Sequence, residues 1–181
     1  MYTIETYIAR PKTQIETQFN YYSEKLFLEY PEFCYISIKN KDEIIDLLNK
    51  ESITPEYLNM AIVIKNNKII VGYENKGLNL WDNFVDLLVS LIEKESSETM
   101  LGIEPRIIKL VKKGNNKLEC TIYHEYELES KQLFILEHKE FINSLIISGN
   151  DFYSKLLEYN FPNKVHLEEN LARLKDIADK I

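Results

Sequence analysis

The sequence predicts an α+β protein in which an antiparallel-rich mixed sheet packs against several helices, with a C-terminal helical pair. Three observations lead to this prediction. Short apolar stretches of strand composition alternate along the chain with segments whose apolar residues recur every three or four positions. Asparagine-containing turns separate pairs of strand-like segments, as in antiparallel hairpins. Residues 139–181 show helical spacing alone.

The length and composition favour one folded unit. A chain of 181 residues buries a sufficient core without disulfides or metal ions. Apolar residues make up 45% of the chain, and only five glycines and five prolines occur, so neither disorder nor a flexible linker is expected. We therefore predict a single α+β domain over residues 1–181, in which residues 1–78 are the candidate for an N-terminal subdomain.

The chain is predicted to begin with a strand and a long helix. Residues 2–9 have strand composition and end at an Arg-Pro pair. A helix is expected from Thr13, where Glu16 completes a capping box, to Tyr30, because Pro31 prevents its continuation. An alternation with a period of two residues, as in a strand, is a competing interpretation of the first half of this segment. The expected apolar stripe consists of Ile15, Phe19, Tyr22, Leu26 and Tyr30.

A second strand and a short helix are expected next. Residues 33–39, FCYISIK, have the composition of a buried strand. Asn40 and Glu43 form a capping pattern ahead of the helical segment DEIIDLLNK. The pair Thr54-Pro55 indicates a further turn of helix, with proline in the first helical position.

A β-hairpin is then predicted. The segments NMAIVIK, residues 59–65, and KIIVGYE, residues 68–74, flank Asn66-Asn67. Asparagine tolerates the positive φ angles of a tight two-residue turn. Because both segments are apolar on both faces near their middles, we expect them to be central in the sheet.

The middle of the chain is predicted to form an apolar helix followed by a β-meander. Asn79 is expected to cap a helix that extends to Lys94 and is apolar around most of its circumference. After a loop, residues 106–113, 117–129 and 132–138 are expected to form three antiparallel strands, with a turn at Gly114-Asn115-Asn116 between the first two.

Two helices are predicted to end the chain. The first covers about residues 139–159 and contains Gly149. A glycine inside a helix costs about 1 kcal/mol relative to alanine, so either it permits a close approach of a neighbour or the helix breaks there. The last helix has a heptad-like seam that is too short to establish a coiled coil, and docking onto the parent domain is favoured over self-association. This seam consists of Leu167, Leu171, Leu174, Ala178 and Ile181.

Charge and composition argue against several classes of protein. There are 29 acidic and 22 scattered basic residues, so the net charge of −7 does not suit a nucleic-acid-binding protein. The apolar segments are much shorter than a membrane span of about 20 residues, and the first residues lack the features of a signal peptide. Cys34 and Cys120 lie in apolar segments, as free thiols do in reducing compartments. We expect a cytoplasmic protein that binds neither nucleic acid nor membranes.

The candidate metal and catalytic motifs are incomplete. His124 lacks the second histidine, four residues further on, that a zincin helix requires. His138 begins an H-x-E sequence, but no cysteine follows it as in zinc deaminases. Cys120 and His124 are about 13 Å apart on an extended strand, which is too far for a catalytic pair. We therefore predict no catalytic residue, metal or cofactor, and interpret Cys34 and His124 as a buried thiol and a satisfied core histidine.

One strand face is the candidate binding surface. Period-two alternation over residues 118–129 places one set of acidic and aromatic side chains on the outward side. This set consists of Glu119, Tyr123, Glu125, Glu127 and Glu129. Strands disfavour glutamate, and like charges at alternate positions repel each other. The simpler explanation is a solvated strand face, and the functional one is an acidic patch with a tyrosine anchor that suits a basic protein.

The segments LWDNFVDLLVSLIE and FINSLIISGNDFYSKLLE flank the predicted meander. Over about residues 79–160 this order resembles small cytoplasmic bacterial immunity proteins that accompany secreted toxins. The resemblance implies an inhibitor that binds its cognate toxin and blocks it without chemistry of its own. We thus expect a non-catalytic protein that neutralises a toxin domain, as a monomer or homodimer. The alternatives are a homo-oligomeric structural or regulatory protein and an enzyme with an unrecognised carboxylate or tyrosine site.

Overall fold

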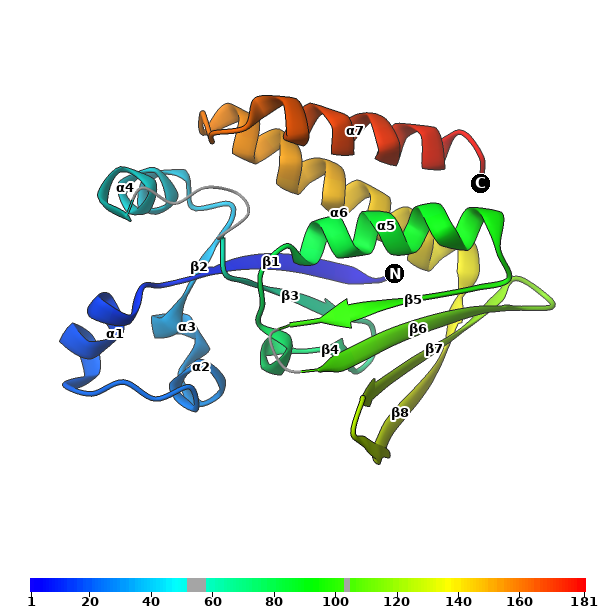
Figure 1. The fold of residues 1–181 in the computed structure, drawn as a ribbon, viewed down its shortest axis with the longest axis horizontal. Helices are drawn as coiled ribbons and strands as arrows, with labels where there is room; N and C mark the ends of the chain where they lie inside the picture. Colours follow the sequence, from blue (N-terminus) through cyan, green and yellow to red (C-terminus); the bar gives the residue numbers. More distant parts are fainter. Residues whose placement is uncertain (52–57, 103–104) are drawn as a thin grey trace.

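The computed structural model describes residues 1–51, 58–102 and 105–181. It confirms the α+β class, with antiparallel strands and a C-terminal pair of helices. The described strands form two four-stranded sheets, with the orders β2-β1-β3-β4 and β5-β6-β7-β8. Helices α5, α6 and α7 lie together on one side of these sheets (Figure 1).

The first sheet contains β1 (Thr3–Ala9), β2 (Tyr35–Ser37), β3 (Met60–Lys65) and β4 (Ile69–Val71). All of its ladders are antiparallel. β3 is central and buried along almost its whole length, as its apolar sequence predicts. The central position predicted for β4 is wrong, because β4 is an edge strand.

The hairpin between β3 and β4 forms at the predicted place with a different turn. Asn66 N–H donates to the Lys68 carbonyl at 3.0 Å. Neither Asn66 nor Asn67 has a positive φ, so the predicted turn geometry is wrong there. The positive φ angles occur instead at Asn115 and Asn116, 61° and 58°, in the predicted turn of the other sheet.

The second sheet contains β5 (Ser96–Leu101), β6 (Arg106–Lys113), β7 (Lys117–His124) and β8 (Glu127–Glu137). The predicted meander corresponds to β6, β7 and β8. β5 was expected to be a loop, because its sequence SSETML is mostly polar and alternates weakly.

The predicted strand over residues 117–129 is wrong at its C-terminal end. β7 stops at His124, and the chain turns through Glu125 and Tyr126 before β8 returns. Glu125 N–H donates to the Pro105 carbonyl at 2.7 Å, and His124 N–H donates to Ser130 Oγ at 2.9 Å. These two hydrogen bonds, to Pro105 and Ser130, stabilise the turn, and the period-two alternation of the strand sequence does not predict them.

The long N-terminal helix predicted over residues 13–30 is also wrong. It is divided into α1 (Lys12–Phe19) and α2 (Leu26–Glu29), and α3 (Pro31–Cys34) follows. Asn20 takes the left-handed conformation, with φ 61°, and its N–H donates to the Glu16 carbonyl. An asparagine in this conformation ends a helix as a glycine does.

The rest of the N-terminal region follows the prediction more closely. The strand expected over residues 33–39 is reduced to β2, because Pro31 starts a short helix that takes up Phe33 and Cys34. The short helix predicted after Asn40 is α4 (Lys41–Glu51). The expected turn at Thr54-Pro55 lies outside the described residues.

Helix α5 (Leu80–Glu93) is almost entirely enclosed. Asn79 is at its N-cap in a left-handed conformation, with φ 54°, and its side chain makes no capping bond. Trp81 and Phe84 are fully buried. Trp81 Nε1–H donates to Thr6 Oγ1 at 2.9 Å, which joins α5 to β1. A 3₁₀ turn, η2 (Tyr73–Asn75), lies between β4 and this helix.

The two C-terminal helices are α6 (His138–Glu158) and α7 (Lys164–Ala178). α6 continues through Gly149, where an added Cβ would lie 3.1 Å from Trp81 Cζ3 and 3.0 Å from Leu174 Cδ1. This confirms the close-approach alternative for Gly149. Leu167 and Leu174 are fully buried, so the seam of α7 docks onto its own domain.

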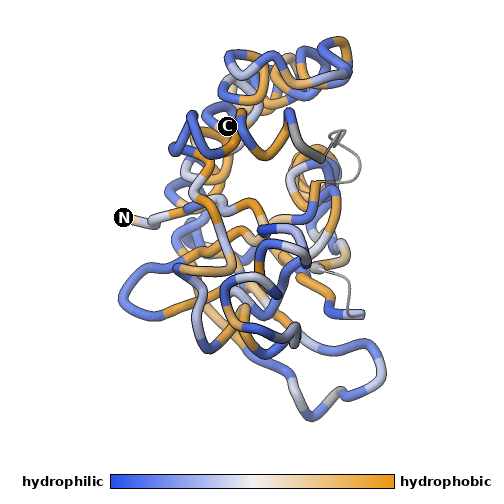
Figure 2. Tube along the Cα trace, turned by 90° about the vertical axis from the view of Figure 1, so that its left-hand side faces the viewer, coloured by the Kyte–Doolittle hydropathy of each residue, from blue (hydrophilic) through white to orange (hydrophobic). Residues whose placement is uncertain are grey.

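The main hydrophobic cluster contains residues of both sheets and of α4 to α7. A smaller cluster forms where α1 to α3 meet β1 to β3. Along the trace the hydrophobic segments lie mostly inside and the hydrophilic ones mostly on peripheral loops (Figure 2). None of the described helices combines the length and apolar composition of a membrane span.

Candidate functional site

The five residues of the predicted binding face lie in and beside the β7–β8 hairpin. Glu119 and Tyr123 are on β7, Glu125 is in the turn, and Glu127 and Glu129 are on β8. Glu119 pairs with Lys113 at 3.2 Å, away from the turn. Because Glu127 stands opposite His124 in the ladder, it lies on the face away from Tyr123. The hairpin thus gathers the last three glutamates at its tip, on more than one face.

The hairpin tip has a concentration of unpaired negative charge. Glu125, Glu127 and Glu129 are exposed, and none forms an ion pair within the described part of the chain. Tyr126, between them, has 79% of its surface exposed. In Figure 1 this tip extends away from the α5–α7 layer. The charge and the aromatic ring are therefore both accessible.

The outer face of the second sheet carries apolar side chains among charged ones. The inner face packs Ile108, Leu110, Cys120 and other residues into the main core. The side chains of the opposite face belong to the alternate positions of each strand. They include Met100, Ile107, Val111, Tyr123, Leu133 and Ile135.

Three of these apolar side chains are more than half exposed: Met100 at 51%, Leu133 at 53% and Ile135 at 58%. Across the sheet Met100 stands opposite Ile107 and Ile107 opposite Tyr123, whereas Leu133 stands opposite Thr121 and Ile135 opposite Glu119. Single exposed apolar residues are common, but several of them on one sheet face favour an interaction surface. We call this group, with Ile107, Val111 and Tyr123, the outer sheet face.

The charges around the outer sheet face are mostly paired with each other. Lys109 and Glu98 are 3.3 Å apart, and Lys117 pairs with Glu137. The uncompensated charge is therefore concentrated at the hairpin tip. A sequence pattern does not show which charged side chains are paired and which are unpaired, because the partners in these ion pairs lie on neighbouring strands.

A second exposed group was missed by the sequence interpretation. Phe19 contacts Tyr21, Tyr30 and Phe33, with ring centroids 5.4 to 6.5 Å apart. The last three rings are 54%, 43% and 46% exposed. The helical stripe predicted for residues 13–30 assigned Phe19 and Tyr30 to the core. The signal for the break was Asn20, followed by two tyrosines of low helix propensity.

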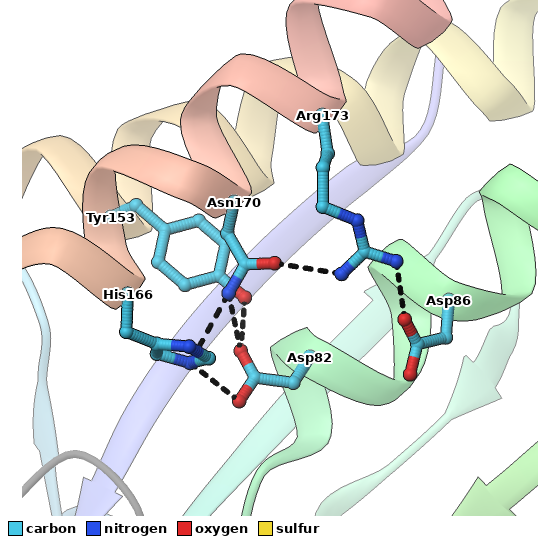
Figure 3. Close-up of polar contacts among 6 residues, drawn as sticks. All are labelled: Asp82, Asp86, Tyr153, His166, Asn170 and Arg173. Atoms are coloured by element: carbon cyan, nitrogen blue, oxygen red, sulfur yellow. Dashed lines mark hydrogen bonds and ion pairs between the residues drawn. The ribbon is translucent and has the colours of Figure 1, made fainter.

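A polar network connects the three C-terminal helices (Figure 3). Asp82 on α5 accepts hydrogen bonds from Tyr153 Oη at 2.5 Å and Asn170 Nδ2 at 3.0 Å. Its second carboxylate oxygen is 2.9 Å from His166 Nε2. Burial raises the pKa of Tyr153, and the neighbouring Asp82 raises it further, so the phenol stays a hydrogen-bond donor.

Asp82, Tyr153 and His166 are residue types that act as acids and bases in enzymes. The cavity beside them has a volume of about 10 Å³, and Trp81 and Leu167 also line it. That volume admits about one water molecule. The network is better explained as the polar contact that fixes α7 on α5 and α6.

A hollow of about 500 Å³ lies between α2, η2 and β6, with Phe27 and Tyr73 in its lining. Lys76 Nζ lies 3.6 Å from the Phe27 ring centroid and 2.5 Å from Glu24. Arg106 approaches Glu74 at 3.9 Å. Two pairs of charges in the lining of the hollow, Lys76–Glu24 and Arg106–Glu74, are thus close together, and Lys25 also lines it.

The predictions for the cysteines and His124 have different outcomes. Cys34 and Cys120 are fully buried and free, and burial raises the pKa of Cys120 to about 12. His124 is only partly buried, and its Nδ1 accepts a bond from Tyr126 N–H at 3.3 Å. The interpretation of His124 as a core histidine is wrong, because β7 ends at this residue. The described residues contain no cluster of three or more His, Cys, Asp or Glu side chains placed to hold a metal ion.

Comparison of this chain with protein-family models, with curated proteins and with solved structures gave no match.

Proposed function

We propose that this chain is a non-catalytic protein that binds and neutralises a basic toxin domain, through the outer sheet face and the acidic hairpin tip. The observation that supports the proposal most is the exposure of Met100, Leu133 and Ile135 on one sheet face. An apolar surface in water lowers solubility, so its presence on an exposed face is explained by a partner that covers it.

The outer sheet face supplies contact area. Tyr123 and Ile107 are cross-strand neighbours at its middle, with Thr121 buried beside them. Aromatic and aliphatic side chains that lose their water on binding contribute most of the affinity of typical interfaces. Around this middle, the paired charges Lys109–Glu98 and Lys117–Glu137 form a polar rim.

The hairpin tip supplies attraction at a distance. Glu125, Glu127 and Glu129 are exposed and lack ion-pair partners in the described residues, and the chain as a whole has a charge of −7. Unpaired surface charge accelerates the encounter with an oppositely charged protein and selects against partners of the same sign. A basic partner therefore fits this end of the surface.

The two alternatives have less support. An enzyme with a tyrosine or carboxylate site would use the Asp82 network, where the adjoining cavity has a volume of only about 10 Å³. Self-association through the C-terminal helix would require the seam of Leu167 and Leu174, which is buried within the chain.

The test is a binding measurement with a candidate toxin domain. The candidate is the C-terminal domain of a large secreted protein encoded beside this chain, because genes for toxins and their immunity proteins are expected to be neighbours. Glu125→Lys with Glu127→Lys should slow association about tenfold at low salt and flatten its salt dependence, with little change in dissociation.

The control makes the same charge change elsewhere. Glu168 and Glu169 are exposed on α7, which lies far from the hairpin tip (Figure 1). Their replacement by lysine should leave most of the association rate intact. If both pairs of substitutions slow association equally, only net charge matters and the hairpin tip is not the site. If no binding is measured with the wild type, the proposal fails.

The apolar part is tested separately. Ile135→Ser should accelerate dissociation, because it removes contact area from the outer sheet face. Ile147→Ser is the control, since Ile147 is 69% exposed on α6. Equal effects of the two substitutions would contradict the assignment of this face.

A further inference from the structure

β8 is an edge strand with an unpaired side. In its sheet it pairs with β7 alone. Glu137 N–H donates to Tyr2 Oη at 3.0 Å, on the side away from β7. Because alternate residues of an antiparallel strand direct their backbone groups to opposite sides, Leu133 and Ile135 direct theirs to the same open side as Glu137. Within the described residues these groups have no hydrogen-bond partner on that side.

The unpaired edge is short and has defined ends. At its C-terminal end, the ring of Tyr2 occupies the position beside Glu137. At its N-terminal end, the β7–β8 register is interrupted between Ile122 and His124, so the strand is irregular before Gln132. Such interruptions normally protect an edge from pairing. Here they leave free the N–H and C=O groups of two residues whose side chains are apolar and more than half exposed.

We infer that this edge binds the same edge of a second copy of the chain, as an antiparallel β8–β8 pair centred on Phe134. In this register Leu133 of each copy stands opposite Ile135 of the other. Because both residues direct their backbone groups to the open side, each Leu133–Ile135 pair is a hydrogen-bonded pair that exchanges two backbone bonds, and the free groups of both residues are satisfied. The two apolar side chains cover each other on the outer sheet face.

Charge selects the same register. Centring on Phe134 brings the Lys131 side chain of one copy towards the Glu137 side chain of the other, twice by symmetry, just beyond the last free ladder position, because Glu137 N–H already donates to Tyr2 Oη. Lys131 is exposed and has no ion pair among the described residues. A register centred on Leu133 would instead bring Glu129 opposite Glu137, and like charges directly opposite each other destabilise a sheet.

The pairing is isologous and therefore closes as a dimer. It joins the two β5–β8 sheets edge to edge, covers Leu133 and Ile135, and leaves Met100, Ile107 and Tyr123 accessible, so it competes with the proposed toxin binding at Leu133 and Ile135 only. The interface is small, and we expect a weak dimer that forms as the protein concentration rises. It is distinct from self-association through α7.

Sedimentation equilibrium of the purified chain, over a range of concentrations, tests the inference together with hydrogen exchange at the lowest and highest concentrations. We expect a monomer–dimer equilibrium, and slower exchange of the Leu133 and Ile135 amides at high concentration. Lys131→Glu should raise the dissociation constant of the dimer roughly fivefold or more, because it creates two like-charge pairs. Adding Glu137→Lys to this variant should return most of the affinity.

Lys109→Glu is the matched control. It makes the same charge change on β6, away from the edge, and should leave the dimer unchanged. A chain that stays monomeric at the highest soluble concentration overturns the inference. A dimer whose dissociation constant is unchanged by Lys131→Glu also overturns it. The same holds for a dimer in which the amides that become protected from hydrogen exchange lie at residues 19–33 or on α7, and not on β8.

Discussion

Gly149 provides a sharp test of how the three C-terminal helices pack, because two effects of known sign compete there. Alanine in place of glycine inside a helix gains about 1 kcal/mol of helix propensity. At this position, however, the new Cβ would lie 3.1 Å from Trp81 Cζ3 and 3.0 Å from Leu174 Cδ1. Overpacking of a core costs about 1–3 kcal/mol.

We therefore expect Gly149→Ala to lower the free energy of unfolding by about 0–2 kcal/mol, the difference between these two effects. Gly149→Val adds two further methyl groups and gains less propensity, so it should lose about 2–3 kcal/mol. Urea unfolding followed by circular dichroism measures both free energies. The slope of the unfolding free energy against urea concentration should be the same in each variant as in the wild type.

A double-mutant cycle identifies the cause. Leu174→Ala alone should cost about 2–5 kcal/mol, because Leu174 is fully buried. Combined with Gly149→Ala, it removes one of the two close contacts, and the double variant should be more stable than the sum predicts by at least about 0.5 kcal/mol. If Gly149→Ala stabilises the protein by the full propensity gain, and the cycle is additive, the close approach of α6 to α5 and α7 is refuted.

Three further predictions concern the polar network, an acidic group and a thiol. Asp82→Ala should lower the free energy of unfolding, measured with urea, by about 1–3 kcal/mol, because it leaves three hydrogen-bond partners unsatisfied. Asp86→Ala is the control and should cost under about 1 kcal/mol, because the Asp86 side chain is 65% exposed. Equal losses would contradict the structural role of the network. The hydrogen bond from Lys65 lowers the pKa of Glu5 below its ordinary 4.5, so its stabilisation is complete above that pH and is lost as the pH falls through the lower folded-state pKa. Glu5→Gln should therefore weaken the decline in stability between about pH 4.5 and pH 3 by under about 1 kcal/mol, and an unchanged pH profile would count against this. Cys120 is fully buried and its pKa is raised, so a thiol reagent at neutral pH should label it only after unfolding, and rapid labelling of the native protein would show that the sheet opens.

The strongly periodic segments could be predicted from the sequence. The helices α5, α6 and α7 have apolar residues at helical spacing over many turns, and these residues pack into the main core with both sheets. The buried strand β3 was recognisable from its continuous apolar run. In these cases local pattern and tertiary burial agree.

The errors occurred where a single residue or a distant contact decides the structure. Asn20 ends α1 by taking a left-handed conformation, which composition alone does not distinguish from an ordinary helical residue. The strand β5 is recruited by pairing with β6, although its own sequence has weak strand character. The end of β7 depends on contacts of Glu125 and His124 with Pro105 and Ser130.

The candidate surface was predictable only in part. The sequence identified the glutamates of residues 119–129 and Tyr123 but placed them on one strand face. It did not identify Met100 or the exposure of Leu133 and Ile135, because exposure of an apolar strand residue depends on whether another element covers that face. Among the described residues no helix or strand covers this face, and the periodicity of a strand sequence does not show whether its outer face is covered.

The most direct test of the account is hydroxyl-radical footprinting of the chain with and without a candidate basic toxin domain. Methionine and tyrosine side chains react readily, and Met100, Tyr126 and Tyr21 are 51%, 79% and 54% exposed. If the outer sheet face and the hairpin tip bind the partner, Met100 and Tyr126 become protected in the complex while Tyr21 does not. Protection of Tyr21 and its aromatic neighbours, with Met100 and Tyr126 unchanged, would contradict the account and move the binding site to residues 19–33.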